Sequence, residues 1–207
     1  MIQITMALTK GRILTETLPL LKLAGITPLE DIAGSRKLVF GTNIDWLKVL
    51  VLRGADVPTY VQYGVADLGV SGKDILLERD STSYYEPLDL GIARCRLMTA
   101  VLKDAKPSRG RIIVATKYTN VARKFYAERG RQAELIKLYG AMELAPLLNL
   151  ADEIVDIVDT GKTLKANGLV AVEHVADVTS RLIVNKAAMK TKCTQIQEII
   201  DRLRGVI

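Results

Sequence analysis

Residues 143–164, ELAPLLNLADEIVDIVDTGKTL, contain the transition that decides the fold. The run 154–158 is short and rich in β-branched residues, which predicts a buried strand. A helix is expected from Thr163 onward, directly after the loop that holds Gly161. A loop at the start of a helix offers free backbone N–H groups and the positive end of the helix dipole, which together bind anions. The sequence therefore predicts a phosphate site between this strand and this helix.

The side chains of the loop suit a phosphorylated sugar. Thr160 and Thr163 offer hydroxyl donors, and Gly161 lets the backbone approach a ligand closely. Carboxylates repel phosphate, so Asp156 and Asp159 favour sugar hydroxyls or a magnesium ion carried with the phosphates. A P-loop NTPase is disfavoured, because the first glycine of GxxxxGK[ST] would fall at Asp156. An ordinary strand-to-helix turn capped by threonine remains the alternative.

The same arrangement recurs at three other expected junctions, after strands at 2–8, 66–70 and 111–115. Each junction carries a hydroxyl and a lysine: Thr9-Lys10-Gly11-Arg12, Ser71-Gly72-Lys73-Asp74 and Thr116-Lys117-Tyr118-Thr119-Asn120. Ligands of open α/β sheets collect at the carboxyl ends of strands, so these junctions are candidates for one polyanion site. Taken singly, each junction also fits a solvated helix cap.

Composition favours a compact α/β protein without membrane segments. The chain has 207 residues, 49% of them hydrophobic, which suffices for a substantial core. No apolar stretch is long enough to span a membrane, and no signal-peptide pattern precedes the first strand, so a cytoplasmic location is expected. Cys95 and Cys193 are too few and too distant for a disulfide framework, and both are expected to be free thiols.

The net charge of +6 points to anionic ligands. Aromatic residues make up only 5% and the basic residues are dispersed, so small anions explain the charge better than nucleic acid does. His174 is the only histidine, and a surface helix position is a simpler expectation for it than a metal site or a catalytic relay.

The order of expected elements predicts an α/β fold with two domains. Domain I comprises residues 1–90 and 180–207, and domain II comprises residues 91–179 with the phosphate loop. A polar, tyrosine-rich stretch at 78–87 is the expected hinge. A cleft between two such lobes is a natural ligand site.

Several motifs, taken in order along the chain, resemble the ATP phosphoribosyltransferase family, which performs the first step of histidine biosynthesis. They are Lys10-Gly11-Arg12, SRKL at 35–38, RGADVPTY at 53–60, ADLGVSGKD at 66–74, ELAP at 143–146 and DIVDTGKTLKANGL at 156–169. The chain departs from the family signature at Asn149, where the pattern has glycine. This departure concerns the backbone geometry of the loop before the strand.

The resemblance implies a two-lobed fold like that of the type II periplasmic binding proteins, with a cleft between the lobes. The length is similar to that of the short form of the family, which has no C-terminal regulatory domain. Short-form catalytic chains pair as homodimers and assemble with a regulatory subunit resembling histidyl-tRNA synthetase into a hetero-octamer.

The implied reaction joins ATP and phosphoribosyl pyrophosphate through N1 of adenine, with Mg²⁺ on the substrate phosphates and no metal held by the protein alone. The resemblance implies that residues 160–163, including Lys162, hold the 5-phosphate, and that Asp156, Asp159 and Glu143 lie at the ribose. Arg12 and Arg36 are the expected catalytic cations, because positive charge stabilises the departing pyrophosphate. Further substrate-binding residues are expected at Lys10, Gly11, Arg53, Asp67 and Lys73.

Several of these residues, and the function itself, also fit other interpretations. Glu143 fits a helix-capping acid, and Arg53 and Asp67 fit structural ion pairs. A two-lobed binding module without turnover is one rival function. Another is a type I phosphoribosyltransferase, although its loop acids are usually adjacent, whereas Asp156 and Asp159 are three positions apart.

Overall fold

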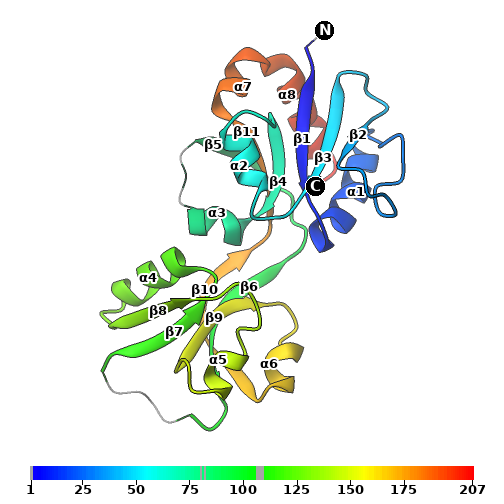
Figure 1. The fold of residues 1–207 in the computed structure, drawn as a ribbon. Coiled ribbons are helices and arrows are strands. Elements are labelled where there is room, and N and C mark those ends of the chain that lie inside the picture. Colours follow the sequence, from blue (N-terminus) through cyan, green and yellow to red (C-terminus); the bar gives the residue numbers. More distant parts are fainter. Residues whose placement is uncertain (1, 80, 82, 106–109) are drawn as a thin grey trace. The chain divides into compact units, whose positions relative to one another are not determined.

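The computed structural model describes residues 2–79, 81, 83–105 and 110–207. The chain forms two compact units. The first unit comprises Met1–Leu76, Asp80–Ala93 and Thr179–Ile207, and the second comprises Leu77–Arg79 and Arg94–Val178. Each unit is built around its own sheet (Figure 1).

The sheet of the first unit is mostly parallel at its centre. Its strand order is β2 (Val39–Gly41), β3 (Leu47–Leu52), β1 (Ile4–Thr9), β4 (Leu68–Gly72), β11 (Ser180–Asn185) and β5 (Tyr84–Asp89). β1 runs parallel to both β3 and β4, while β11 is antiparallel to β4 and to β5. The carboxyl ends of β1, β3 and β4 therefore meet at one edge of the sheet.

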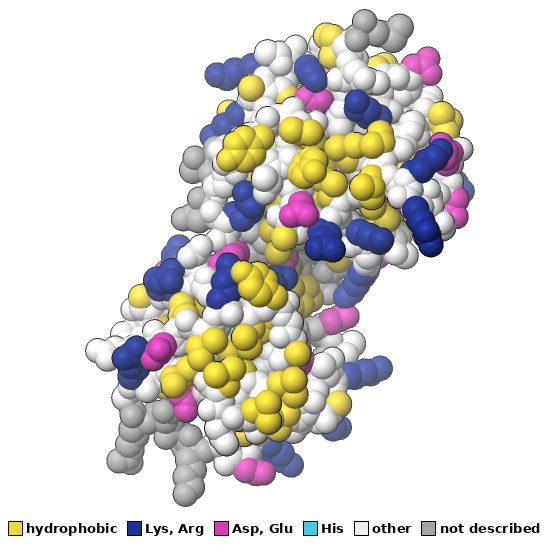
Figure 2. All heavy atoms as spheres, in the orientation of Figure 1, with side chains coloured by type: hydrophobic (Ala, Val, Ile, Leu, Met, Phe, Trp, Pro, Cys, Tyr) yellow, Lys and Arg dark blue, Asp and Glu magenta, His cyan; other side chains and the backbone are white. Residues whose placement is uncertain are grey.

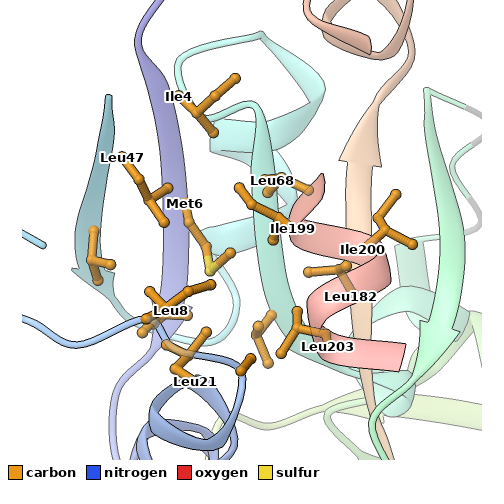
Figure 3. Packing of buried hydrophobic residues seen from close by; sticks show 14 of the residues in the cluster. Ile4, Met6, Leu8, Leu21, Leu47, Leu68, Leu182, Ile199, Ile200 and Leu203 are labelled. Carbon is orange, nitrogen blue, oxygen red and sulfur yellow. The ribbon is translucent and has the colours of Figure 1, made fainter. Parts of the chain in front are cut away.

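Helices cover both faces of this sheet. They are α1 (Arg12–Leu23), α2 (Val57–Gln62), α7 (Lys186–Thr191) and α8 (Cys193–Arg204), with α3 (Lys73–Arg79) following β4. All six residues of β1 are buried, as expected for a central strand covered on both faces. Met6 and Leu8 of β1 join the cluster of α1 and α8, shown in Figure 3, while Ala7 between them joins the cluster of α2.

The pattern of α8 explains why it packs on the sheet. Its buried residues are Ile196, Ile199, Ile200 and Leu203, which recur at helical spacing on one face. The remaining face carries the charged pairs Glu198–Arg202 and Asp201–Arg204.

The second unit has a mixed five-stranded sheet. Its order is β10 (Leu169–Val178), β6 (Cys95–Leu102), β9 (Glu153–Val158), β7 (Ile112–Thr116) and β8 (Ala133–Lys137), and its helices are α4 (Thr119–Glu128), α5 (Leu144–Leu147) and α6 (Lys162–Ala166). β7, β8 and β9 are parallel to one another, and β6 is antiparallel to β9. The side chains of α5 and α6 pack on one face of this sheet, where Ala145 and Leu164 join Ile154 in the core.

The predicted α/β class and the strand before the phosphate loop are confirmed, and both cysteines are free thiols. The hinge expected at 78–87 stays a prediction; this stretch contains β5, which pairs with β11 in the first sheet, while its residues Asp80 and Thr82 lie outside the described residues. One expectation is wrong. His174 lies on strand β10 rather than on a helix, with a ring nitrogen 3.0 Å from Asp177 Oδ1. Among the residues that the structure describes, no helix is both long and apolar enough to cross a membrane.

Candidate functional site

In the first unit, three strand ends are tied together at the carboxyl edge of the sheet. The N–H of Lys10, just after β1, donates to the carbonyl of Leu52 at the end of β3 at 2.8 Å. The hydroxyl of Thr9 donates to the carbonyl of Val70 in β4, also at 2.8 Å. Residues that follow these strands are therefore held close to one another.

Five cations follow or flank these strand ends, and we call this group the basic edge: Lys10, Arg12, Arg36, Arg53 and Lys73. Lys10 and Arg12 follow β1, Arg53 follows β3, and Lys73 follows β4. Arg36 lies in the loop that enters β2, and this loop is anchored beside the end of β3 by a 2.9 Å bond from Val51 N–H to the Leu38 carbonyl. The structure therefore brings these five predicted site residues to the same edge.

Gly11 starts α1 and supports the basic edge through its backbone. Its φ of 93° lies in the region that favours glycine, and no side chain caps the helix there. The backbone N–H groups of the first turn lie beside Lys10 and Arg12, so cationic side chains and the helix dipole act together on an anion.

Glu16 is the acid nearest the start of α1. Its Oε1 accepts a hydrogen bond from Arg12 Nε at 2.7 Å, and its Oε2 accepts one from the N–H of Ala93 at 2.7 Å. The bond from Ala93, and after it the bond from Arg12, lower the pKa of Glu16 from its usual value of 4.5. Glu16 therefore stays ionised beside Arg12.

Lys73 is partly neutralised. Its Nζ lies 2.7 Å from Glu86 Oε2, and both side chains are less than a third exposed. Lys73 therefore brings less net charge to the basic edge than the exposed Arg36 and Arg53 do.

Asp67 lies apart from the basic edge. It precedes β4, at the amino end of the strand, and is only 5% exposed. Its carboxylate accepts from the N–H of Thr5 at 2.9 Å and pairs with Lys192 Nζ at 2.8 and 3.0 Å. These contacts agree with the alternative expectation for Asp67, a structural ion pair.

In the second unit, the phosphate loop Asp159–Thr163 follows β9. Gly161 has a φ of 73°, in the left-handed region, and its carbonyl accepts the N–H of Lys165 at 3.1 Å to start the short helix α6. Leu164 is buried in the core and anchors this turn, whereas Thr160 and Thr163 are exposed. The turn therefore exposes its hydroxyls and backbone to solvent, while the buried Leu164 holds it in place.

The three predicted acids differ in their surroundings. Asp156 lies within β9 and is half-buried, while Asp159 lies in the loop and is exposed. Glu143 is the N-cap residue of α5, and its side chain makes no capping hydrogen bond there. Since α5 packs against β9 through Ala145 and Ile154, Glu143 is carried by the same local core as Asp156.

Three further cations occupy the edge of the second sheet where β9 ends. Lys117 follows β7, Lys137 is the last residue of β8, and Arg96 stands opposite Val158 in the antiparallel partner β6. Lys117 belongs to the predicted strand-to-helix junction at 116–120, but the sequence motifs indicate no specific role for it. The sequence did not indicate Lys137 and Arg96 as site residues, because strand pairing brings them to this edge and no local sequence pattern contains that pairing.

Within the described ranges, no group of three or more His, Cys, Asp or Glu residues could hold a metal ion by itself. A divalent ion that arrives on substrate phosphates needs only one or two carboxylates. Asp159, exposed in the phosphate loop, fits that requirement. Figure 2 shows Lys and Arg side chains spread over the visible face of each unit with acidic side chains between them, rather than in one block.

Comparison with known proteins gives consistent matches. The family model HisG, described as ATP phosphoribosyltransferase, matches residues 53–205. The ATP phosphoribosyltransferase of Saccharophagus degradans is 66% identical over 207 residues, covering 100% of this chain and 97% of that protein. The protein of the same name from Teredinibacter turnerae is 62% identical, with the same coverage.

A solved structure gives the corresponding likeness in three dimensions. The ATP phosphoribosyl transferase (HisG:HisZ) complex from Thermotoga maritima contains a chain that matches with a TM-score of 0.85 and 31% sequence identity. The match covers 99% of this chain and 98% of that one. The likeness therefore extends over both units.

Proposed function

Because the chain belongs to the HisG family of ATP phosphoribosyltransferases, we propose that its phosphate loop and its basic edge act in the same reaction, on different parts of the substrates. The family performs the first step of histidine biosynthesis and is a pentosyltransferase. Phosphoribosyl pyrophosphate and ATP give phosphoribosyl-ATP and pyrophosphate. The observation that carries the assignment of the loop is the exposed, glycine-centred turn at the end of β9, with acids on either side of the strand end.

The phosphate loop is the proposed site of the ribose 5-phosphate. Thr160 and Thr163 would donate hydroxyl hydrogen bonds, Lys162 would add charge, and the backbone around Gly161 would approach the phosphate oxygens. Asp156 and Asp159 would accept from the ribose hydroxyls, with Glu143 beside them. A phosphate alone would not need these acids, so their presence favours a phosphorylated sugar.

The basic edge is the proposed site of the pyrophosphate group, which gains negative charge as it leaves during the reaction. The bond from the anomeric carbon to pyrophosphate breaks, and the bond to N1 of adenine forms. Negative charge grows on the departing pyrophosphate, and fixed cations stabilise that charge most when they are already in place. Arg12 and Arg36 are the proposed catalytic cations, and Lys10, Gly11, Arg53 and Lys73 are the proposed binding residues. Asp67 has no role in this proposal, because it is buried in its pair with Lys192.

The enzyme class needs a divalent metal. We propose that the ion is Mg²⁺ and that it enters on the substrate phosphates. Asp159 is the proposed protein contact, because its carboxylate is exposed beside the phosphate loop.

The similar chain from Thermotoga maritima belongs to a HisG:HisZ complex. We propose a HisZ-type regulatory subunit, resembling histidyl-tRNA synthetase, as the partner of this chain, together with a homodimer of catalytic chains inside a hetero-octamer. The cytoplasmic location stays a prediction.

The test of the catalytic cations is turnover in Arg12→Ala and Arg36→Ala. Loss of one fixed charge-stabilising group typically costs on the order of 100-fold or more in kcat, so we expect that loss in each variant. Arg204→Ala is a matched control, because Arg204 is similarly exposed and also pairs with an acid of its own helix. Turnover equal to that of the control would remove the arginine concerned from the mechanism.

A further inference from the structure

Glu16 connects the start of α1 to a distant part of the backbone. One carboxylate oxygen accepts from Arg12 Nε, and the other accepts from the N–H of Ala93, which is 77 residues away in sequence. Both distances are 2.7 Å, typical of charge-assisted hydrogen bonds. Through these two hydrogen bonds, Glu16 links the Arg12 side chain to the backbone at Ala93.

The backbone at Ala93 is itself held in place. The N–H of Ser180 donates to the carbonyl of Ile92 at 3.0 Å, and the N–H of Leu90 donates to the carbonyl of Ser180 at 2.9 Å. Ala93 is 9% exposed and has a φ of 51°, a conformation that alanine adopts only where its surroundings impose it. Its N–H is thus a fixed donor for the Glu16 carboxylate.

Helix stability gives no good reason for the Arg12–Glu16 pair. The side chains are 51% and 36% exposed, and exposed ion pairs contribute little to stability. A cation in the first turn faces the positive end of the dipole, and the order Arg then Glu is the weaker one for a helix. α8 carries the favourable order, with Glu198 before Arg202.

We propose that Glu16 is a positioning residue for the transferase reaction: its carboxylate, fixed by Ala93, orients the guanidinium of Arg12 toward the phosphates that the basic edge binds. This inference rests on the proposed function of Arg12. An arginine held by a fixed carboxylate loses less side-chain entropy when it meets its ligand and is already oriented for the transition state.

The test is a double-mutant cycle on the 207-residue chain, assayed alone and with a HisZ-type subunit. Glu16→Gln keeps the size of the side chain and an acceptor for Ala93 but loses the charge. We expect it to lower kcat roughly tenfold, less than the ~100-fold that a misplaced catalytic group can cost, with little change in KM. Because Glu16 acts through Arg12, Arg12→Ala/Glu16→Gln should be no slower than Arg12→Ala alone.

Chemical rescue separates positioning from a structural role. Guanidinium ion added to Arg12→Ala should restore part of the turnover, because it can pair with Glu16, and the same ion should fail in Arg12→Ala/Glu16→Gln. Glu198→Gln is the control, since it breaks a matched pair on α8 and should leave kcat unchanged.

The outcomes are distinct. Full turnover in Glu16→Gln, losses that multiply in the double variant, or equal rescue in both backgrounds would overturn the positioning role while leaving Arg12 in place. Full turnover in Arg12→Ala would overturn the proposed function of Arg12 and the positioning role together.

Discussion

Asn149 takes the place of the glycine in the family signature by adopting a glycine-like conformation. Its φ is 56°, in the left-handed region that asparagine tolerates better than most residues. We expect Asn149→Gly to leave the free energy of unfolding nearly unchanged. Glycine adopts this φ easily, but it also makes the unfolded chain more flexible, and the two effects oppose each other. Asn149→Ala should lower the free energy of unfolding by about 1 kcal/mol, the usual cost of a left-handed alanine. Urea unfolding measures both changes, and equal stability of Asn149→Ala and the parent chain would contradict this account.

Glu16 should make stability depend on acid pH. Its pKa is lowered in the folded chain from 4.5, so its contribution is present above the unfolded pKa and is lost as pH falls through the folded one. The parent chain should therefore have a higher Tm than Glu16→Gln near neutral pH, and the difference should shrink below about pH 4.5. A Tm difference that does not vary with pH would show that charge is not the cause.

Among the elements, the phosphate loop gives the sharpest prediction about binding. Gly161→Val places a β-branched residue at a φ of 73° and should distort the turn. Phosphoribosyl pyrophosphate affinity, measured by calorimetry, should fall at least about tenfold, because one hydrogen bond to a charged group is worth ~1.5–3 kcal/mol.

Gly130→Val is the matched control for the loop. Gly130 also has a left-handed φ, of 64°, but it precedes β8 and so lies at the opposite edge of the same sheet. Comparable backbone strain is therefore introduced away from the loop. If both variants bind phosphoribosyl pyrophosphate equally well, the 5-phosphate site lies elsewhere.

The contact between α2 and β4 leads to a prediction about stability. A Cβ on Gly69 would lie 2.8 Å from methyl carbons of both Val57 and Val61. Gly69→Ala should therefore cost ~1–3 kcal/mol of unfolding free energy, as overpacked cores do. Thermal unfolding checks it, and an unchanged Tm would mean that α2 moves aside without cost.

Local sequence patterns predicted the helices and strands better than they predicted which distant residues contact one another. The β-branched run at 154–158 lies within β9, because β-branched runs and turn residues are local signals. The local motif around Asp67 fitted a substrate role and a structural ion pair alike, because its partner Lys192 lies 125 residues away. Glu16 was missed for the same reason, since only the folded chain brings Ala93 to it.

Across the whole chain, the alternation of strands and helices predicted the α/β class, and β11 and α8 join the core of the first unit. Composition did not show that part of the tyrosine-rich stretch at 78–87 forms the edge strand β5, because strand pairing is not a local signal. The domain boundaries at 90 and 180 stay predictions about parts that fold independently.

Transfer of a phosphoribosyl group to ATP by this chain can be measured directly. The direct measurement mixes the purified chain with ATP, phosphoribosyl pyrophosphate and Mg²⁺, and follows the near-ultraviolet absorbance of the modified adenine together with pyrophosphate release. We expect both signals to rise together, with one pyrophosphate released for each adenine modified. Binding of the substrates with neither signal, even after a HisZ-type subunit is added, would contradict it and indicate a binding module without turnover.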